Sequence, residues 1–229
     1  MNAIKLREHL RFAVNGPIGN LIETLENIGI LVYMVDIDNP SFSGMNGFVD
    51  ERPYIAINKA MSDERIRSTI AHELAHLMFD WSDYADKDEQ SIESTVTAIA
   101  GAFLFSSNDA KRELGIHRKS ITKDMLLVCR EYGISMMLLV KRAKIIGIIN
   151  QSAEKEFYSK VSQAGWKKNE PSRIKCPETP MLFEQLVYSE VSEEEISIQK
   201  GAELLKVSYA DIEEHCCFYG GVMDEVNQQ

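Results

Sequence analysis

Apolar residues follow a helical spacing near the start of the chain and then form an unbroken run. The spacing predicts an amphipathic helix over residues 18–28, with apolar positions three or four apart at Ile18, Leu21, Ile22, Leu25 and Ile28. Gly29 ends this helix, and the branched run 30–35 after it predicts a buried strand. Two more strands are predicted at 47–49 and 54–58, where a polar link separates two apolar segments. These two linked strands predict a small antiparallel sheet.

Helical patterns dominate the rest of the chain. One begins at Ser62, a residue type that often caps a helix N-terminus. An acidic segment separates it from the next helix, which extends to about Phe105. Further helices are predicted at 125–132, 136–148, 153–164, 181–191 and 197–205. We therefore predict a mostly helical α+β protein, with a core over residues 1–108 and a helical region over 109–229 that packs on the core.

Composition and charge exclude several classes of protein. The chain has 229 residues, of which 45% are hydrophobic and 26% are charged, a balance that excludes a disordered or collagen-like protein. No stretch approaches the roughly 18 consecutive apolar residues of a membrane span, and the first residues lack the apolar segment of a signal peptide. A net charge of −10 without a basic stripe argues against direct binding of nucleic acid. The four cysteines lack metal-site spacing, so we expect reduced thiols in the cytoplasm.

The sequence His-Glu-Leu-Ala-His at residues 72–76 lies in the middle of the helix that begins at Ser62. Two histidines four residues apart occupy one helix face, so the imidazoles of His72 and His76 can reach the same metal ion. Glu73 lies about 100° around the helix from His72, where its carboxylate can take a proton from a water molecule that attacks a peptide carbonyl. The competing interpretation is two structural histidines beside a solvated glutamate.

A catalytic zinc site needs a third protein ligand. A histidine further along the same segment is excluded, because the position where such patterns place it holds Ser82. A carboxylate on the following helix is the alternative, and Glu93 shares a face of that helix with its inward apolar residues. A carboxylate on a buried face is costly unless a cation meets it, which favours Glu93. Glu89, one turn earlier, is the rival candidate. Such a ligand set suits zinc best but tolerates manganese or iron.

The strand predicted at 54–58 precedes the helix that carries the two histidines. Its residues are candidates for substrate binding if it is an edge strand, because peptidases commonly hold an extended target by adding it to a sheet. An ordinary strand inside the sheet is an equal alternative. The candidate residues are Tyr54, Ile55, Ala56, Ile57 and Asn58.

Longer stretches around these residues resemble the ImmA/IrrE family of metallopeptidases. Residues 65–76, Arg-Ile-Arg-Ser-Thr-Ile-Ala-His-Glu-Leu-Ala-His, are similar to the family's stretch R-x-R-F-T-x-A-H-E-L-G-H. Residues 52–58 resemble its P-x-I-x-x-N strand, and residues 93–106 resemble its pattern E-x-x-A-x-x-F-A-x-x-L-L-x-P. The family's Phe, Gly and Pro are replaced at three positions that are not ligands, namely Ser68, Ala75 and Ser106.

The resemblance implies a minimal zincin-like core that binds one zinc ion through His72, His76 and Glu93, with Glu73 as the catalytic residue. It implies an endopeptidase whose protein substrate is a helix-turn-helix repressor of the Xre type, controlling a mobile element or a stress operon, or an antitoxin. Segments in the second half look like the tail of members that carry an N-terminal Xre-type domain. Because this chain begins close to the peptidase segment, we expect the DNA-binding domain on a separate partner.

The alternative is a non-catalytic function, in which the protein is a metal-binding, antitoxin-like partner of a regulator or toxin. The intact Glu73 favours the enzyme, because a structural metal site gains nothing from a general base. Under either function we expect the helical region 109–229 to recognise the partner or substrate. We expect no contact with a membrane and no direct contact with nucleic acid.

Overall fold

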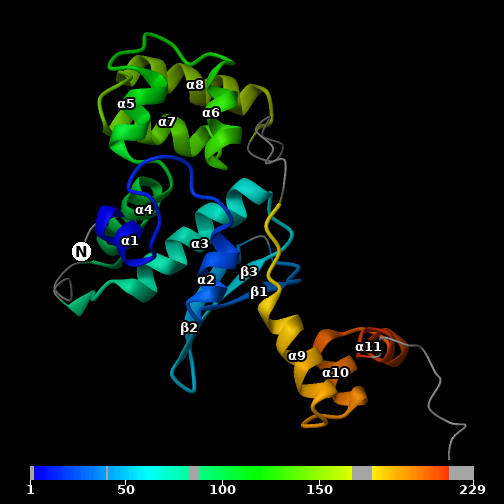
Figure 1. Cartoon of the computed structure of the whole chain (residues 1–229). Coiled ribbons are helices and arrows are strands. Elements are labelled where there is room, and N and C mark those ends of the chain that lie inside the picture. The colour runs from blue at the N-terminus through cyan, green and yellow to red at the C-terminus, as the bar shows by residue number, and fades with distance from the viewer. Residues whose placement is uncertain (1–2, 40, 83–87, 167–176, 217–229) are drawn as a thin grey trace, which may run out of the picture. The chain divides into compact units, whose positions relative to one another are not determined.

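The computed structural model describes residues 3–39, 41–82, 88–166 and 177–216 (Figure 1). It confirms an α+β architecture that is mostly helical. The chain divides into two compact units, Met1–Thr179 and Pro180–Gln229. The boundary suggested by the sequence at residue 108 lies within the first unit.

The elements follow one another along the chain in a simple order. The first unit contains α1 (Ala3–His9), α2 (Leu21–Asn27), β1 (Leu31–Val35), β2 (Gly44–Val49), β3 (Arg52–Asn58), α3 (Asp63–Met78), α4 (Glu89–Leu104), α5 (Ser107–Leu114), α6 (Met125–Tyr132), α7 (Met136–Ile145) and α8 (Gln151–Gln163). The second unit contains α9 (Leu182–Ser192), α10 (Ile198–Leu205) and α11 (Tyr209–Cys216). None of the described helices has both the length and the apolar character that crossing a bilayer requires.

The sheet has three strands in the order β1-β3-β2. β2 and β3 form an antiparallel hairpin, whose turn residues Asp50 and Glu51 both have positive φ, as a two-residue turn between twisted strands requires. The antiparallel pairing predicted for the strands at 47–49 and 54–58 is confirmed, and β1 adds a parallel strand to β3, so the sheet is mixed. The order explains the difference, because the loop between β1 and β2 carries the chain past the position that β3 then fills.

α3 is the central helix of the first unit, because it packs against both the sheet and α4. Its buried residues include Ile66, Ile70 and Leu74. α4 begins at its N-cap Asp88, whose side chain accepts a hydrogen bond from the backbone N–H of Ser91 at 2.8 Å. Val96, Ala100 and Phe103 on α4 are buried in the same hydrophobic core as α3. This pairing fixes the faces of α3 and α4 relative to each other.

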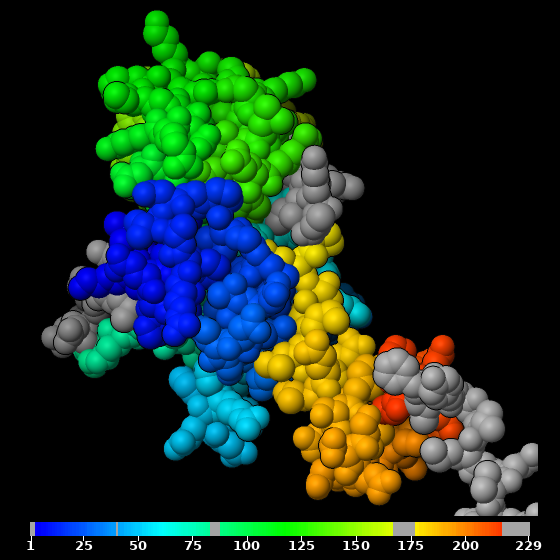
Figure 2. Space-filling model, in the orientation of Figure 1, coloured from blue at the N-terminus to red at the C-terminus, as the bar shows by residue number. Residues whose placement is uncertain are grey.

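α1 and α5 were not predicted from the sequence, because each turns a charged residue inward. Arg7 on α1 is 1% exposed, and its Nε donates to the carbonyl of Phe103 at 2.7 Å. Asp109 on α5 is completely buried and accepts a hydrogen bond from the backbone N–H of Gly16 at 2.8 Å. Figure 2 shows the result, with the blue N-terminal residues lying directly against the green segment that follows α4. Buried charged side chains that bond to backbone groups therefore accompany the few apolar residues of these two short helices.

The second unit is formed by α9, α10 and α11, which pack on one another around Val187, Val191 and Ile212. A Cβ atom at Gly201 would lie 2.8 Å from Cγ2 of Val191, so α10 approaches α9 this closely because residue 201 is glycine. α11 was not predicted, since Ile212 is its only buried residue.

The segment just before the second unit is fixed to the first unit by a buried ion pair. Arg67 on α3 donates to the carbonyls of Ile18 and Gly19 at 3.0 and 2.9 Å and contacts the carboxylate of Glu178. Glu178 also accepts from the backbone N–H groups of Leu21 and Ile22 at 3.0 and 3.1 Å. Burial lowers the pKa of Arg67 to about 10, so the guanidinium is still charged at neutral pH.

We expect Glu178→Ala to lower the free energy of unfolding by about 3–5 kcal/mol, because it leaves the buried guanidinium of Arg67 without its counter-charge. Urea titration at neutral pH measures the change. Glu203→Ala is the matched control, since the pair between Glu203 and Lys200 is exposed and is worth at most about 1 kcal/mol. Equal losses in the two variants would show that the Glu178 pair does not stabilise the fold.

Candidate metal centre

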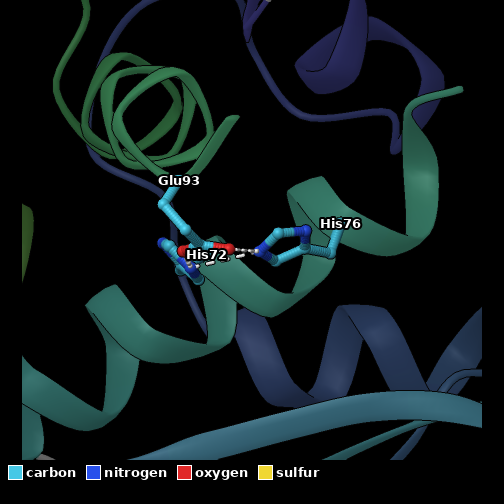
Figure 3. A group of neighbouring side chains, drawn as sticks. All are labelled: His72, His76 and Glu93. Atoms are coloured by element: carbon cyan, nitrogen blue, oxygen red, sulfur yellow. Dashed lines mark hydrogen bonds and ion pairs between the residues drawn. The ribbon is translucent and has the colours of Figure 1, made fainter. Parts of the chain in front are cut away.

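Three side chains from α3 and α4 meet at one point (Figure 3). His72 and His76 lie one turn apart on α3, and both imidazoles face the carboxylate of Glu93 on α4. The Nε2 atoms of His72 and His76 each lie 3.1 Å from a carboxylate oxygen of Glu93 and 3.3 Å from each other. Among the described residues, these three form the one group of His, Cys, Asp and Glu close enough to share a metal ion.

The spacing of these atoms fits a bound metal ion. Ligand atoms about 2.1 Å from a tetrahedral zinc ion lie about 3.4 Å from one another. The two imidazole nitrogens are 3.3 Å apart, close to that value, and each lies 3.1 Å from its own oxygen of the Glu93 carboxylate, Oε2 for His72 and Oε1 for His76. Two imidazole nitrogens and one carboxylate oxygen are also the donor set of catalytic zinc sites, which leave the fourth position for water or substrate.

The structure distinguishes between Glu93 and Glu89, the two candidates for the third ligand. Glu93 reaches both histidines, whereas Glu89 is the exposed first residue of α4 and is outside the group of three. The side chains of the group are partly exposed, at 23% for His72, 21% for His76 and 44% for Glu93. A substrate therefore has access to the point where the three ligand atoms converge.

Thr97 is a residue of the site that the sequence did not reveal. It lies one turn after Glu93 on α4, and its Oγ1 is 3.4 Å from Nδ1 of His72. This contact holds the imidazole with Nε2 toward Glu93, since a ring nitrogen that binds a metal is commonly oriented by a hydrogen bond at the other nitrogen. A threonine four residues after a glutamate is too common a pattern to attract notice in a sequence.

We expect Thr97→Val to weaken zinc binding by about 10- to 100-fold, because the variant keeps the shape of the side chain but cannot hydrogen-bond to His72. Competition with a chromogenic chelator measures the affinity. Thr95→Val is the control, because the Thr95 hydroxyl donates to the carbonyl of Ser91 on its own helix. Identical affinities in both variants would exclude a role for Thr97 in orienting His72.

Glu73 lies beside the metal centre and is held by the sheet. Its side chain is largely buried, with the residue 9% exposed, and its Oε2 accepts a hydrogen bond from Nδ2 of Asn46 on β2 at 2.7 Å. The Asn46 amide donates a hydrogen bond but carries no positive charge. The Glu73 carboxylate can therefore still accept a proton. Asn46 was not predicted, since it lies 27 residues before Glu73 and only the pairing of β2 with β3 brings it there.

Of the two alternatives for residues 54–58, an edge strand or an ordinary strand inside the sheet, the structure has the second. β3 lies between β1 and β2, so its backbone is hydrogen-bonded on both sides and cannot add a substrate strand. Asn58 is 4% exposed, and its Nδ2 donates to the carbonyls of Ile37 and Phe42 at 3.2 and 3.1 Å, which fixes the loop before β2. β2, which carries Asn46, is the edge strand on the side of Glu73.

Comparison with known proteins agrees with this geometry. Residues 25–144 match the model of a peptidase family described as the IrrE N-terminal-like domain. The matched range contains the sheet, α3, α4 and the whole group of His72, Glu73, His76 and Glu93. Among curated proteins, none matches the chain at a significant level.

Proposed function

Because the chain belongs to the IrrE N-terminal-like family of peptidases, we propose that it is a zinc-dependent endopeptidase that cleaves a protein substrate. The proposal rests on one observation. His72, His76 and Glu93 converge next to the carboxylate of Glu73, and Glu73 is not part of the metal group. A purely structural site would use all its acids as ligands and would have no position open to water.

The residues have separate tasks in hydrolysis. His72, His76 and Glu93 would hold the zinc ion, which would supply a Lewis acid for the substrate carbonyl and for water. Glu73 takes a proton from the attacking water and passes it to the leaving amine, as a general base and then a general acid. Asn46 holds the Glu73 carboxylate in place through its amide, so that the carboxylate needs no rearrangement before it reacts.

An extended substrate would lie along β2. This strand is at the edge of the sheet and carries Asn46 beside Glu73, so a peptide paired with its backbone would pass the metal centre. Gly47 of β2 makes room for the ring of Tyr54 on β3, since a Cβ atom at residue 47 would lie 2.9 Å from that ring. We therefore assign to β2 the substrate binding for which residues 54–58 were candidates.

The substrate that fits best is a transcriptional repressor of the Xre type, or an antitoxin, acting in the cytoplasm. The chain has a net charge of −10, which repels DNA but attracts a protein whose own surface is basic because it binds DNA. A peptidase of this charge reaches a promoter region only through such a partner.

The test is to incubate the full chain with zinc and an Xre-type regulator from the same genome, and to follow the regulator by mass spectrometry. We expect two defined fragments, and none when zinc is removed by a chelator or when Glu73 is replaced by alanine. An intact regulator in every condition contradicts the proposal. A stable, uncleaved complex that is indifferent to Glu73→Gln would identify the protein as a non-catalytic partner instead.

A further inference from the structure

A cavity of about 320 Å³ opens beside His72, on a side of the metal centre that the mechanism above does not use. Ser68 lines it one turn before His72 on α3, and Thr97 and Ala98 line it on α4. α7 and α8 complete the wall, and no residue of β2 contributes to it. The cavity therefore borders the reacting centre through His72, separately from the edge where a substrate backbone would pair.

The wall of the cavity is mainly apolar. Met137, Leu138 and Ile145 line it from α7, opposite small residues of α4. Arg142 contributes its aliphatic stem, because its guanidinium is turned away and its Nε donates to the carbonyl of Phe105 at 3.1 Å. At Gly101, a Cβ atom would lie 3.1 Å from Cδ of that stem. The space is near the lower limit for a ligand pocket, which suits one large side chain and not a whole cofactor.

Lys141 is the one charged group of the wall, besides Arg142, in the described part of the chain. Its side chain is exposed, and it forms no ion pair with another described residue. An ammonium group at this position repels a lysine or arginine that enters the cavity, whereas it does not oppose an apolar side chain. The cavity thus has both an apolar wall and a charge that excludes basic residues.

We propose that this cavity is the subsite for a large apolar side chain, Leu, Met or Phe, next to the bond that is cleaved, and that it excludes Lys and Arg. The inference rests on the proposed peptidase function. A peptide whose reacting carbonyl lies at the metal centre places the adjacent Cα within two bonds of it, and the cavity that begins at His72 is then open to its side chain. Each methylene that such a site buries changes kcat/KM by about 10- to 200-fold.

The first test profiles cleavage by the zinc-loaded full chain with a mixed peptide library, read by mass spectrometry. We expect Leu, Met and Phe to be enriched at one position adjacent to the cut. Ala98→Phe fills the cavity from an exposed helix position, so it should shift the preference to Gly and Ala and lower kcat/KM for a leucine peptide at least about tenfold. Ser159→Phe, with the same bulk at an exposed position of α8 outside the cavity, should leave the preference unchanged.

Two further variants should accept side chains that the wild type rejects. Leu138→Ala enlarges the cavity and should extend the preference to Trp, and Lys141→Glu should allow Lys and Arg at the same position. Cleavage with no preference next to the cut, or a preference that none of these substitutions changes, overturns the proposed subsite.

The second test needs no catalysis. In protein labelled with ¹³C-methyl methionine, the Met137 resonance is assigned by its loss in Met137→Leu. N-acetyl-leucinamide should shift it in the wild type but not in Ala98→Phe, and N-acetyl-lysinamide should not shift it. A Met137 resonance that leucinamide leaves unchanged overturns the subsite. A shifted resonance together with an uncut library supports the subsite and overturns the proposed peptidase function instead.

Discussion

Glu73→Gln is expected to reduce hydrolysis of the substrate by about 10²- to 10⁴-fold while the protein binds zinc with unchanged affinity. Glutamine has the same shape and can still contact Asn46, but its amide cannot take a proton from water. The metal group is untouched, because Glu73 is outside the set formed by His72, His76 and Glu93. The loss should therefore fall on kcat, with little change in KM.

The measurement is single-turnover cleavage of the regulator, with zinc affinity determined on the same protein samples. Glu89→Gln is the control, since it removes the same charge from an exposed position at the start of α4. If Glu73→Gln cleaves as fast as Glu89→Gln, Glu73 is not the general base, and the chemistry has to be assigned to another group.

Glu93→Ala is expected to weaken zinc binding by more than about 100-fold, because it removes one of three ligands, a larger change than the loss of a group that merely orients a ligand. The fold should be unaffected, because the Glu93 side chain is 44% exposed and its ion pairs within the described part of the chain are those with the two histidines. Without zinc, the variant and the wild type should therefore unfold at the same temperature.

Thermal unfolding with and without zinc separates these effects. The wild type should be stabilised by zinc, since a ligand that binds the folded state raises its stability, and Glu93→Ala should not be stabilised at the same concentration. A zinc-dependent rise of equal size in both proteins would mean that Glu93 is not a ligand. A variant that unfolds early without zinc would mean that Glu93 has a structural role.

The pattern of apolar positions was sufficient to predict most of the helices and strands. The motif at residues 72–76 was sufficient to predict the central part of the site. His72 and His76 are four residues apart on one helix, so their convergence depends on helix geometry alone. Glu93 required one further step, the pairing of two consecutive helices. The structure has that pairing, although the Glu93 side chain is 44% exposed and not buried as the sequence argument assumed.

Contacts that depend on strand order or on buried charge could not be predicted. Asn46 reaches Glu73 because β2 pairs with β3 at the edge of the sheet, and nothing in residues 54–58 indicates that β1 covers their other side. Arg7 and Asp109 occupy buried positions where a pattern of apolar residues predicts solvent, which is why α1 and α5 were missed. In each case the partner lies far away in the sequence.

Diffraction from zinc-soaked crystals of the full chain, measured at the zinc absorption edge, shows whether His72, His76 and Glu93 bind a single zinc ion. We expect one anomalous peak about 2.0–2.2 Å from Nε2 of each histidine and from an oxygen of Glu93. No peak at this position, or a peak on other residues with these three side chains turned apart, would contradict this expectation.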